Sequence, residues 1–260
     1  MMKKILFLIS AVVITISFAL ISCDRNSRKT DETVTVSGIV ADYNGNPIPN
    51  ATVRLQNNAF ESVAETITDN NGHYTLHVKK GRYYAMFALD TDTYPHTAAE
   101  DFPEEDMRLE FWAWNFIADR DMDFDIQYHR IEVYGINIFR IQGATPGYTI
   151  YCRPMSLTRT IEWITAPSPS PYARMSPAPG NAEVKVTING EEVQVRLVQE
   201  VEEYFGEGQK GNAFLISVGL PSAPSPAPYD IFRITISDLE NGDKGEGVFF
   251  LEKKEYVKEQ

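Results

Sequence analysis

The amino-acid sequence predicts an all-β fold: two β-sandwich domains in tandem after a cleaved N-terminal segment. Apolar residues alternate with polar ones in short runs along most of the chain, and the runs end in Gly, Pro, Asn and Asp residues that favour turns. The 260 residues include 14 Phe, 13 Tyr and 3 Trp, and hydrophobic residues make up 43% of the chain. This composition can supply apolar cores and excludes a disordered acidic chain.

The net charge excludes one class of partner. Asp and Glu together number 36 against 24 Lys and Arg, which gives a formal net charge of −12 at pH 7. Binding to phosphate backbones depends on clustered cations, so no nucleic-acid partner is expected.

Residues 1–22 are predicted to be a signal peptide. Two lysines precede the apolar run 5–21, which is too short and too close to the N-terminus for a permanent membrane span. The segment Leu20-Ile21-Ser22-Cys23 resembles the lipobox of bacterial lipoproteins, which implies cleavage before Cys23 and acylation of that cysteine. We therefore expect a lipid-anchored protein of the bacterial cell envelope, at the outer membrane, with 23–33 as the acylated cysteine and tether. An uncleaved anchor with an incidental cysteine is the alternative.

The second cysteine, Cys152, has no disulfide partner if Cys23 is acylated. It lies in an alternating run, which predicts a small buried side chain on a strand.

The first sandwich is predicted at 34–129, with its clearest strands at 34–40, 51–55, 74–78 and 83–89. The segment Gly45-Asn46-Pro47-Ile48-Pro49-Asn50-Ala51-Thr52-Val53 precedes Thr68-Asp69-Asn70-Asn71-Gly72-His73-Tyr74, and this spacing resembles the carboxypeptidase regulatory-like domain. The resemblance implies a transthyretin-like sandwich from Val34 to about Leu89. It implies no catalytic residue, because the matching positions are turn and core positions.

The sequence also argues against an enzyme. A zinc peptidase of the metallocarboxypeptidase kind needs a His-x-x-Glu pair and a later histidine, and none of the four histidines follows His129 and Glu132. The chain has no Gly-x-Ser-x-Gly elbow and no Walker loop. We expect no catalytic residue and no cofactor, with Ca²⁺ as the one exception that the sequence suggests.

The calcium hypothesis concerns four aspartates that alternate with other residues: Asp119, Asp121, Asp123 and Asp125. On a strand they would share one face. Such a row is either a solvated outer face or part of a Ca²⁺ site, which needs six or more oxygen ligands.

The sequence also leaves two alternatives open for a group of aromatic side chains. Trp112, Trp114 and Phe116 would share one face of a strand, where they form either core or an exposed platform for stacking ligands. Trp163, on a strand expected at 161–166, is predicted to be a core or inter-sheet residue.

The second sandwich is predicted at 130–260 with an immunoglobulin-like fold. Its other expected strands are 131–141, 148–153, 183–188, 192–198, 213–220, 231–237 and 247–252. Asn189-Gly190 between two alternating runs is a strong hairpin signal. One larger continuous sheet is the alternative.

Two proline-rich segments, 166–180 and 221–230, interrupt the strands of this half and are predicted to be stiff loops at one end of the sandwich. They offer candidate ligand contacts, which are Tyr172, Arg174, Met175 and Tyr229. Stiff surface loops without a ligand are the alternative.

The sequence thus predicts a non-catalytic envelope protein, anchored to the membrane by lipid. It would act as a binding or accessory module for a glycan, a peptide or another envelope protein. The alternative is a structural or assembly subunit of a cell-surface complex without a small-molecule ligand.

Overall fold

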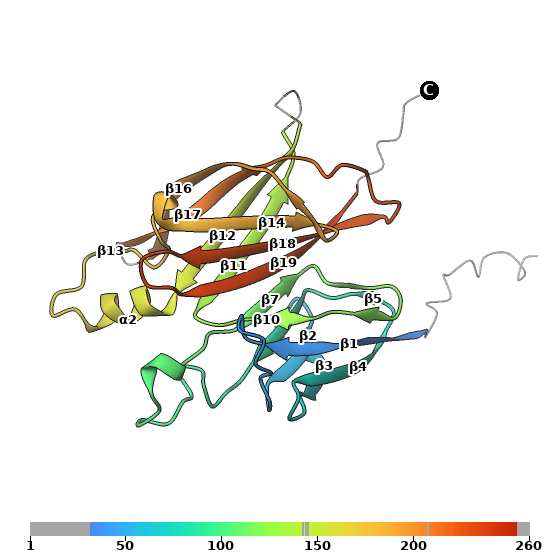
Figure 1. Cartoon of the computed structure of the whole chain (residues 1–260), viewed down its shortest axis with the longest axis horizontal. Helices are drawn as coiled ribbons and strands as arrows, with labels where there is room; N and C mark the ends of the chain where they lie inside the picture. The colour runs from blue at the N-terminus through green and yellow to red at the C-terminus, as the bar shows by residue number, and fades with distance from the viewer. Residues whose placement is uncertain (1–31, 142, 144–145, 207, 254–260) are drawn as a thin grey trace, which may run out of the picture. The chain divides into compact units, whose positions relative to one another are not determined.

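The computed structural model describes residues 32–141, 143, 146–206 and 208–253, so the predicted signal peptide and Cys23 lie outside the described residues. The described residues from Thr33 to Lys253 form one compact unit built of strands (Figure 1). The first ten strands are β1 (Thr33–Ala41), β2 (Thr52–Gln56), β3 (Ser62–Ile67), β4 (His73–Lys79), β5 (Gly81–Arg82), β6 (Ala85–Leu89), β7 (Phe111–Trp114), β8 (Ile117–Ala118), β9 (Met122–Asp123) and β10 (Ile126–Gln127). The other strands are β11 (Ile131–Phe139), β12 (Tyr148–Ser156), β13 (Tyr172–Ala173), β14 (Ala182–Ile188), β15 (Glu191–Val193), β16 (Val195–Gly206), β17 (Gln209–Val218), β18 (Tyr229–Asp238) and β19 (Lys244–Glu252).

Helices are few. They are the α-helix α2 (Leu157–Thr165) and the 3-10 turns η1 (Glu104–Asp106) and η2 (Pro179–Asn181). In the described part of the chain, no helix is long and apolar enough to span a bilayer. The all-β prediction is confirmed.

The largest sheet has eight strands in the order β15-β14-β18-β19-β7-β6-β2-β3, and it takes strands from both sides of the boundary expected at 129 and 130. The strands from before and after this boundary meet where β7 runs parallel to β19, with Trp112 opposite Gly247 and Trp114 opposite Phe249. Glycine is required on β19 because a Cβ at Gly245 would collide with the carbonyl oxygen of Ile131 on β11. The larger continuous sheet, which the sequence left as an alternative, is therefore present. The division into two domains stays a prediction.

Two smaller sheets cover this large sheet and create two cores. The first core contains residues of β1, β4, β2 and one side of β6 and β7, such as Val36, Leu76, Val53 and Phe111. The second contains residues of β11, β12, β17 and β18 together with the other side of β6 and β7, including Trp112 and Trp114. β6 and β7 are buried on both faces, which explains their continuous apolar sequence.

Trp112 and Trp114 belong to a core, one of the two alternatives that the sequence left open for them. Phe116 does not lie on the same face of the chain as these two rings. Trp112 and Trp114 are 8% and 7% exposed and stack at 4.8 Å between ring centroids. Asn115 adopts a left-handed backbone conformation with φ of 53°, which ends β7 and turns Phe116 into the first core. The expected alternation of Trp112, Trp114 and Phe116 is therefore wrong at its last member.

The prediction of a strand at 161–166 is also wrong, because residues 161–165 belong to helix α2 and Ala166 is its C-cap. The hydroxyl of Ser156 caps the helix by accepting a hydrogen bond from the backbone N–H of Arg159 at 3.2 Å. Only Leu157 of the helix is buried, so Trp163 is half-exposed and lies outside both cores.

Cys152 is fully buried on β12, as predicted.

Candidate functional site

The surface around helix α2 and the first proline-rich loop holds two adjoining hollows of about 400 and 450 Å³ that share Trp163 and Ser170. We call them together the Trp163 groove. The apolar lobe is lined by Trp163, Ile164, Pro169, Ser170, Pro171, Gly208 and Gln209. The polar lobe is lined by Arg159, Glu162, Trp163, Ser170, Tyr172 and Arg174.

Helix α2 forms one wall of the groove. Arg159, Glu162 and Trp163 are three and four residues apart, a spacing that places side chains on one face of a helix. Arg159 fixes this wall, because its Nε donates to Asp238 at 2.5 Å and its Nη2 donates to Glu240. The hydrogen bond to Asp238 raises the pKa of Arg159 above its already high value, so this cation is permanent.

The proline-rich loop forms the opposite wall and is held to the helix by the indole of Trp163. Trp163 Nε1 donates a hydrogen bond of 2.8 Å to the carbonyl oxygen of Ser170. The backbone N–H of Tyr172 donates to the Ser170 hydroxyl at 3.1 Å, and β13 then pairs in parallel with β17. The aromatic rings of the groove are therefore fixed in place before any ligand binds.

Tyr172 and Arg174 lie together in the polar lobe. The Arg174 guanidinium carbon is 5.0 Å from the centroid of the Tyr172 ring, a cation–π contact. Arg174 Nη1 and the Tyr172 hydroxyl each donate to Glu200, both at 3.3 Å. Partial burial, followed by the Glu200 charge, raises the pKa of Tyr172, so the hydroxyl stays protonated at neutral pH.

The other two predicted contacts do not join the groove. Met175 is half-buried, and its carbonyl oxygen accepts a hydrogen bond from the Ser156 N–H at 2.9 Å. Tyr229 is 2% exposed and donates from its hydroxyl to Asp119 at 2.8 Å. The expectation that Tyr229 is an exposed contact is therefore wrong. A ligand-binding role for Tyr172, Arg174 and Met175 stays a prediction.

The two proline-rich loops lie at opposite ends of the β14–β18 pair. β14 and β18 are antiparallel, with Ala182 opposite Asp238 and Ile188 opposite Phe232. The first loop leads into β14 at Ala182, whereas the second leads into β18 at Tyr229, next to the other end of β14. The prediction that both loops share one end is wrong, because an antiparallel pair places the starts of its strands at opposite ends.

The aspartate row does not form one face of a strand. Only Met122–Asp123 within it is strand, and the carboxylates bind β1 or Tyr229 instead of converging. Asp121 accepts from the Thr35 N–H at 2.7 Å, Asp125 from the Ile39 N–H at 2.9 Å and Asp123 from the Ser37 hydroxyl at 3.1 Å. These bonds satisfy donors along β1. Among the described residues no three His, Cys, Asp or Glu side chains gather as metal ligands, so the calcium hypothesis for Asp119, Asp121, Asp123 and Asp125 is not supported.

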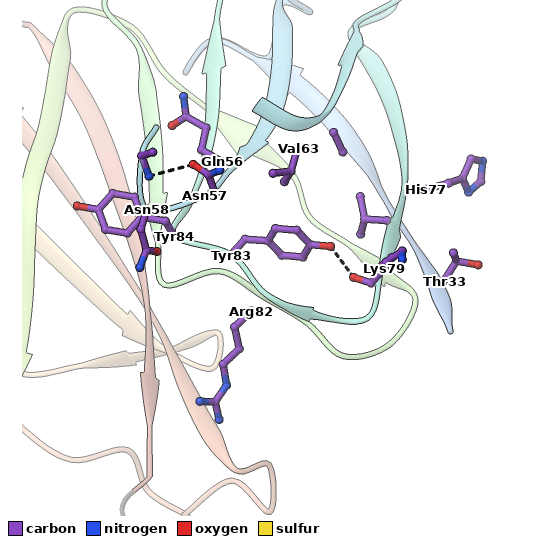
Figure 2. Close-up of a pocket in the computed structure, with 13 residues that line it drawn as sticks. Thr33, Gln56, Asn57, Asn58, Val63, His77, Lys79, Arg82, Tyr83 and Tyr84 are labelled. Atoms are coloured by element: carbon purple, nitrogen blue, oxygen red, sulfur yellow. Dashed lines mark hydrogen bonds between the residues drawn. The ribbon is translucent and has the colours of Figure 1, made fainter. Parts of the chain in front are cut away.

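A third cavity, of about 750 Å³, opens between β3 and β4 and is lined by Val63, Val78 and Tyr83 among others (Figure 2). Most of its polar groups hold the fold. The Tyr83 hydroxyl donates to the Lys79 carbonyl oxygen at 2.5 Å, and Arg82 forms an ion pair with Glu252 at 2.7 Å. Asn57 accepts from the Ala59 N–H at 2.9 Å. We therefore take the Trp163 groove as the better candidate site.

The sequence did not identify Arg159, Glu162 and Trp163 as site residues. The segment 161–166 was interpreted as a strand with Trp163 in a core, and Arg159 was given no role. Two signals favour the helix. Ser156 is a good N-cap residue, and Leu157, Ile161 and Ile164 follow at helical spacings of four and three. The β-branched threonines and isoleucines between them are typical of strands, which obscured that pattern.

Comparison with known proteins supports the identity of the N-terminal part only. Residues 35–96 match the family model of the carboxypeptidase regulatory-like domain, and no curated protein matches the chain. Among solved structures, the chain aligns over 85% of its length with BcpA, the major pilin subunit of Bacillus cereus, at 14% identity and TM-score 0.26, covering 69% of that chain. It aligns over 85% with a protein of Bacteroides uniformis whose name provisionally assigns it to carbohydrate binding, at 9% identity and TM-score 0.27, covering 99% of that chain.

A protein of the DUF3823 family from Parabacteroides merdae also aligns over 85% of this chain and 98% of its own, at 9% identity and TM-score 0.26. Similarities this low carry no argument about function. The match of 35–96 includes most of β1 and all of β2 to β6, and so confirms the resemblance based on Gly45, Pro47, Ala51 and Gly72. Residues 35–96 are therefore similar to the carboxypeptidase regulatory-like domain in sequence, and the similarity covers less than a quarter of the chain.

Proposed function

We propose that the protein is a non-catalytic binding module of the bacterial cell envelope, held there by acyl chains on Cys23, and that it captures a glycan or a peptide in the Trp163 groove. The observation that carries this proposal is that Trp163 and Tyr172 line one open groove together with two arginines and the Glu162 carboxylate. Aromatic rings with a few fixed polar groups are typical of ligand sites.

The charged groups of the groove favour binding over catalysis. Arg159 is paired with Asp238 and Arg174 with Glu200. General acid–base catalysis needs a group that gains and loses a proton near the working pH, and an arginine paired with a carboxylate does neither.

One observation favours the second candidate function, a structural or assembly subunit. β16 is an outer strand of its sheet and exposes Leu197 at 55%, Tyr204 at 72% and Phe205 at 40%. An exposed strand edge with apolar side chains favours pairing with another chain.

An array of glycans and peptides tests both functions. The chain from Asp24 onward should bind members of one class, and Trp163→Ala should lose that binding while Tyr204→Ala keeps it. If Tyr204→Ala changes self-association and neither variant changes ligand binding, the assembly function replaces the proposed one.

A further inference from the structure

The two lobes of the Trp163 groove differ in chemistry, although they share one indole ring. Ile164, with 57% of its surface exposed, and two prolines line the apolar lobe beside Trp163. The polar lobe carries Glu162, Tyr172 and Arg174. A ligand that fills both lobes must have an apolar face for the rings and polar groups at its edge.

The arginines of the polar lobe are already neutralised. Arg174 lies 3.3 Å from Glu200 and Arg159 lies 2.5 Å from Asp238, so a ligand carboxylate would have to compete with a carboxylate of the protein. Glu162 is exposed and adds a negative charge to the same lobe. The electrostatics of the groove therefore disfavour an anionic ligand.

Hydroxyl groups suit such paired charges better. A hydroxyl donates one hydrogen bond and accepts others, so it can donate to the Glu162 carboxylate while a neighbouring hydroxyl accepts from the Arg174 guanidinium. A neutral sugar carries adjacent hydroxyls around its ring and presents C–H groups on its faces. Its faces can pack on Trp163 while its edge meets the polar groups.

The rings need little ordering on binding. The Ser170 carbonyl oxygen fixes the Trp163 indole, and Glu200 and Arg174 fix the Tyr172 ring. A site whose side chains are already fixed loses little conformational entropy when a ligand binds.

We propose that the Trp163 groove binds a neutral carbohydrate chain of at least two sugar units, one packed on Trp163 at the apolar lobe and the next beside Tyr172 and Glu162. This inference rests on the proposed function, since it names the ligand class of the same groove. Two units are required because each lobe, at about 400 and 450 Å³, is the size of a small ligand pocket and Trp163 borders both.

Titration calorimetry on the chain from Asp24 onward tests the proposal, because the unit from Thr33 is compact by itself. The probes are neutral oligosaccharides of two to four units from several linkage types, the matching uronic-acid oligosaccharides, and acidic and proline-rich peptides. A neutral oligosaccharide should bind, and its affinity should change less than about twofold between low salt and about 0.5 M NaCl, because no net charge is neutralised.

Three variants locate the ligand. Trp163→Ala should weaken binding about tenfold or more, as expected for an aromatic hot spot. Glu162→Gln should weaken it roughly threefold, because a neutral amide oxygen replaces the charged acceptor for ligand hydroxyls. Tyr204→Ala is the matched control, an exposed aromatic outside the groove, and should bind as the parent does. Unfolding temperatures measured on the same samples identify any variant that fails to fold.

The outcomes separate the inference from the function on which it rests. The neutral-carbohydrate inference is overturned if the protein prefers uronic-acid chains with strong salt dependence, or if it binds peptides alone. In either case the groove is still supported as a binding site if Trp163→Ala weakens that binding. Binding of no probe, or binding that Trp163→Ala leaves unchanged, overturns the proposed function of the groove and this inference with it.

Discussion

The guanidinium of Arg130 and the carboxylate of Asp243 form a buried ion pair, with Nε 3.0 Å from Oδ1, that joins β11 to the turn before β19. Asp243 also accepts hydrogen bonds from the Ser156 hydroxyl at 2.7 Å and from the backbone N–H and hydroxyl of Thr158 at 3.0 and 3.1 Å. Ser156 and Thr158 lie at the start of helix α2. The pair therefore positions the helix that carries Trp163.

Asp243→Ala should lower the free energy of unfolding by about 3–5 kcal/mol, because it removes the buried carboxylate that pairs with the Arg130 cation. The matched control is Glu65→Ala, which removes an exposed partner of Arg54 and should cost less than about 1 kcal/mol. Urea unfolding measures both changes. Equal effects of the two substitutions would show that the buried pair does not hold the fold.

Tyr229→Phe should lower the free energy of unfolding by about 0.5–1.5 kcal/mol, since it removes one hydrogen bond to Asp119 inside the fold. It should leave ligand binding unchanged. A loss of binding at unchanged stability would contradict the buried position of this residue.

Asn115 tests the backbone turn that sends Phe116 into the first core. Asn115→Ala should destabilise the fold by about 1 kcal/mol because alanine disfavours positive φ, whereas Asn115→Gly should change stability by less than about 0.5 kcal/mol. Thermal unfolding compares the two variants. Equal stability of Asn115→Ala and the parent would contradict the left-handed conformation at this position.

Stability should fall as the pH rises above 4.5 because of Glu132. Burial and the nearby Glu110 raise the pKa of Glu132 well above its ordinary value of 4.5. Between pH 4.5 and the raised value the folded state binds more protons than the unfolded state, so the free energy of unfolding decreases with increasing pH. Glu132→Gln removes this titration and should flatten the stability profile above pH 4.5, measured as unfolding temperature against pH. A profile as steep as that of the parent would contradict the assignment.

Mass spectrometry of the membrane-associated protein tests the anchor. We expect the mature chain to begin at an acylated Cys23, because the apolar run 5–21 leads into the lipobox-like segment that ends at this cysteine. Detection of Met1, or of an unmodified Cys23, would contradict the lipoprotein prediction.

Local chemistry explains what the sequence could predict. Asn189 and Gly190 adopt φ values of 53° and 85° in the hairpin between β14 and β15, as the dipeptide predicts. The parallel pairing of β7 with β19 places Trp112 opposite Gly247. No local sequence pattern predicts a partner so distant in the sequence.

The candidate site was also hard to predict, because residues distant in the sequence determine which of its side chains are buried. The sequence predicted Tyr229 in the proline-rich loop 221–230, whereas it begins β18 and is buried. The residue that accepts its hydroxyl hydrogen bond, Asp119, is 110 residues away. Trp163 was assigned to a core because β-branched neighbours favour strands, whereas the Ser156 cap and the contacts of Asp243 with the helix start stabilise a helix.

The position of the ligand tests the central claim most directly. The chain has three tryptophans, of which Trp112 and Trp114 are buried and Trp163 is half-exposed in the groove. In a nitrogen-15 NMR titration with any probe that binds, we expect the Trp163 indole N–H signal and the backbone signals of 159–174 to shift, while the other two indole signals stay in place. Shifts confined to the cavity around Tyr83 and Val63, with the Trp163 signal unchanged, would contradict the claim that the Trp163 groove is the binding site.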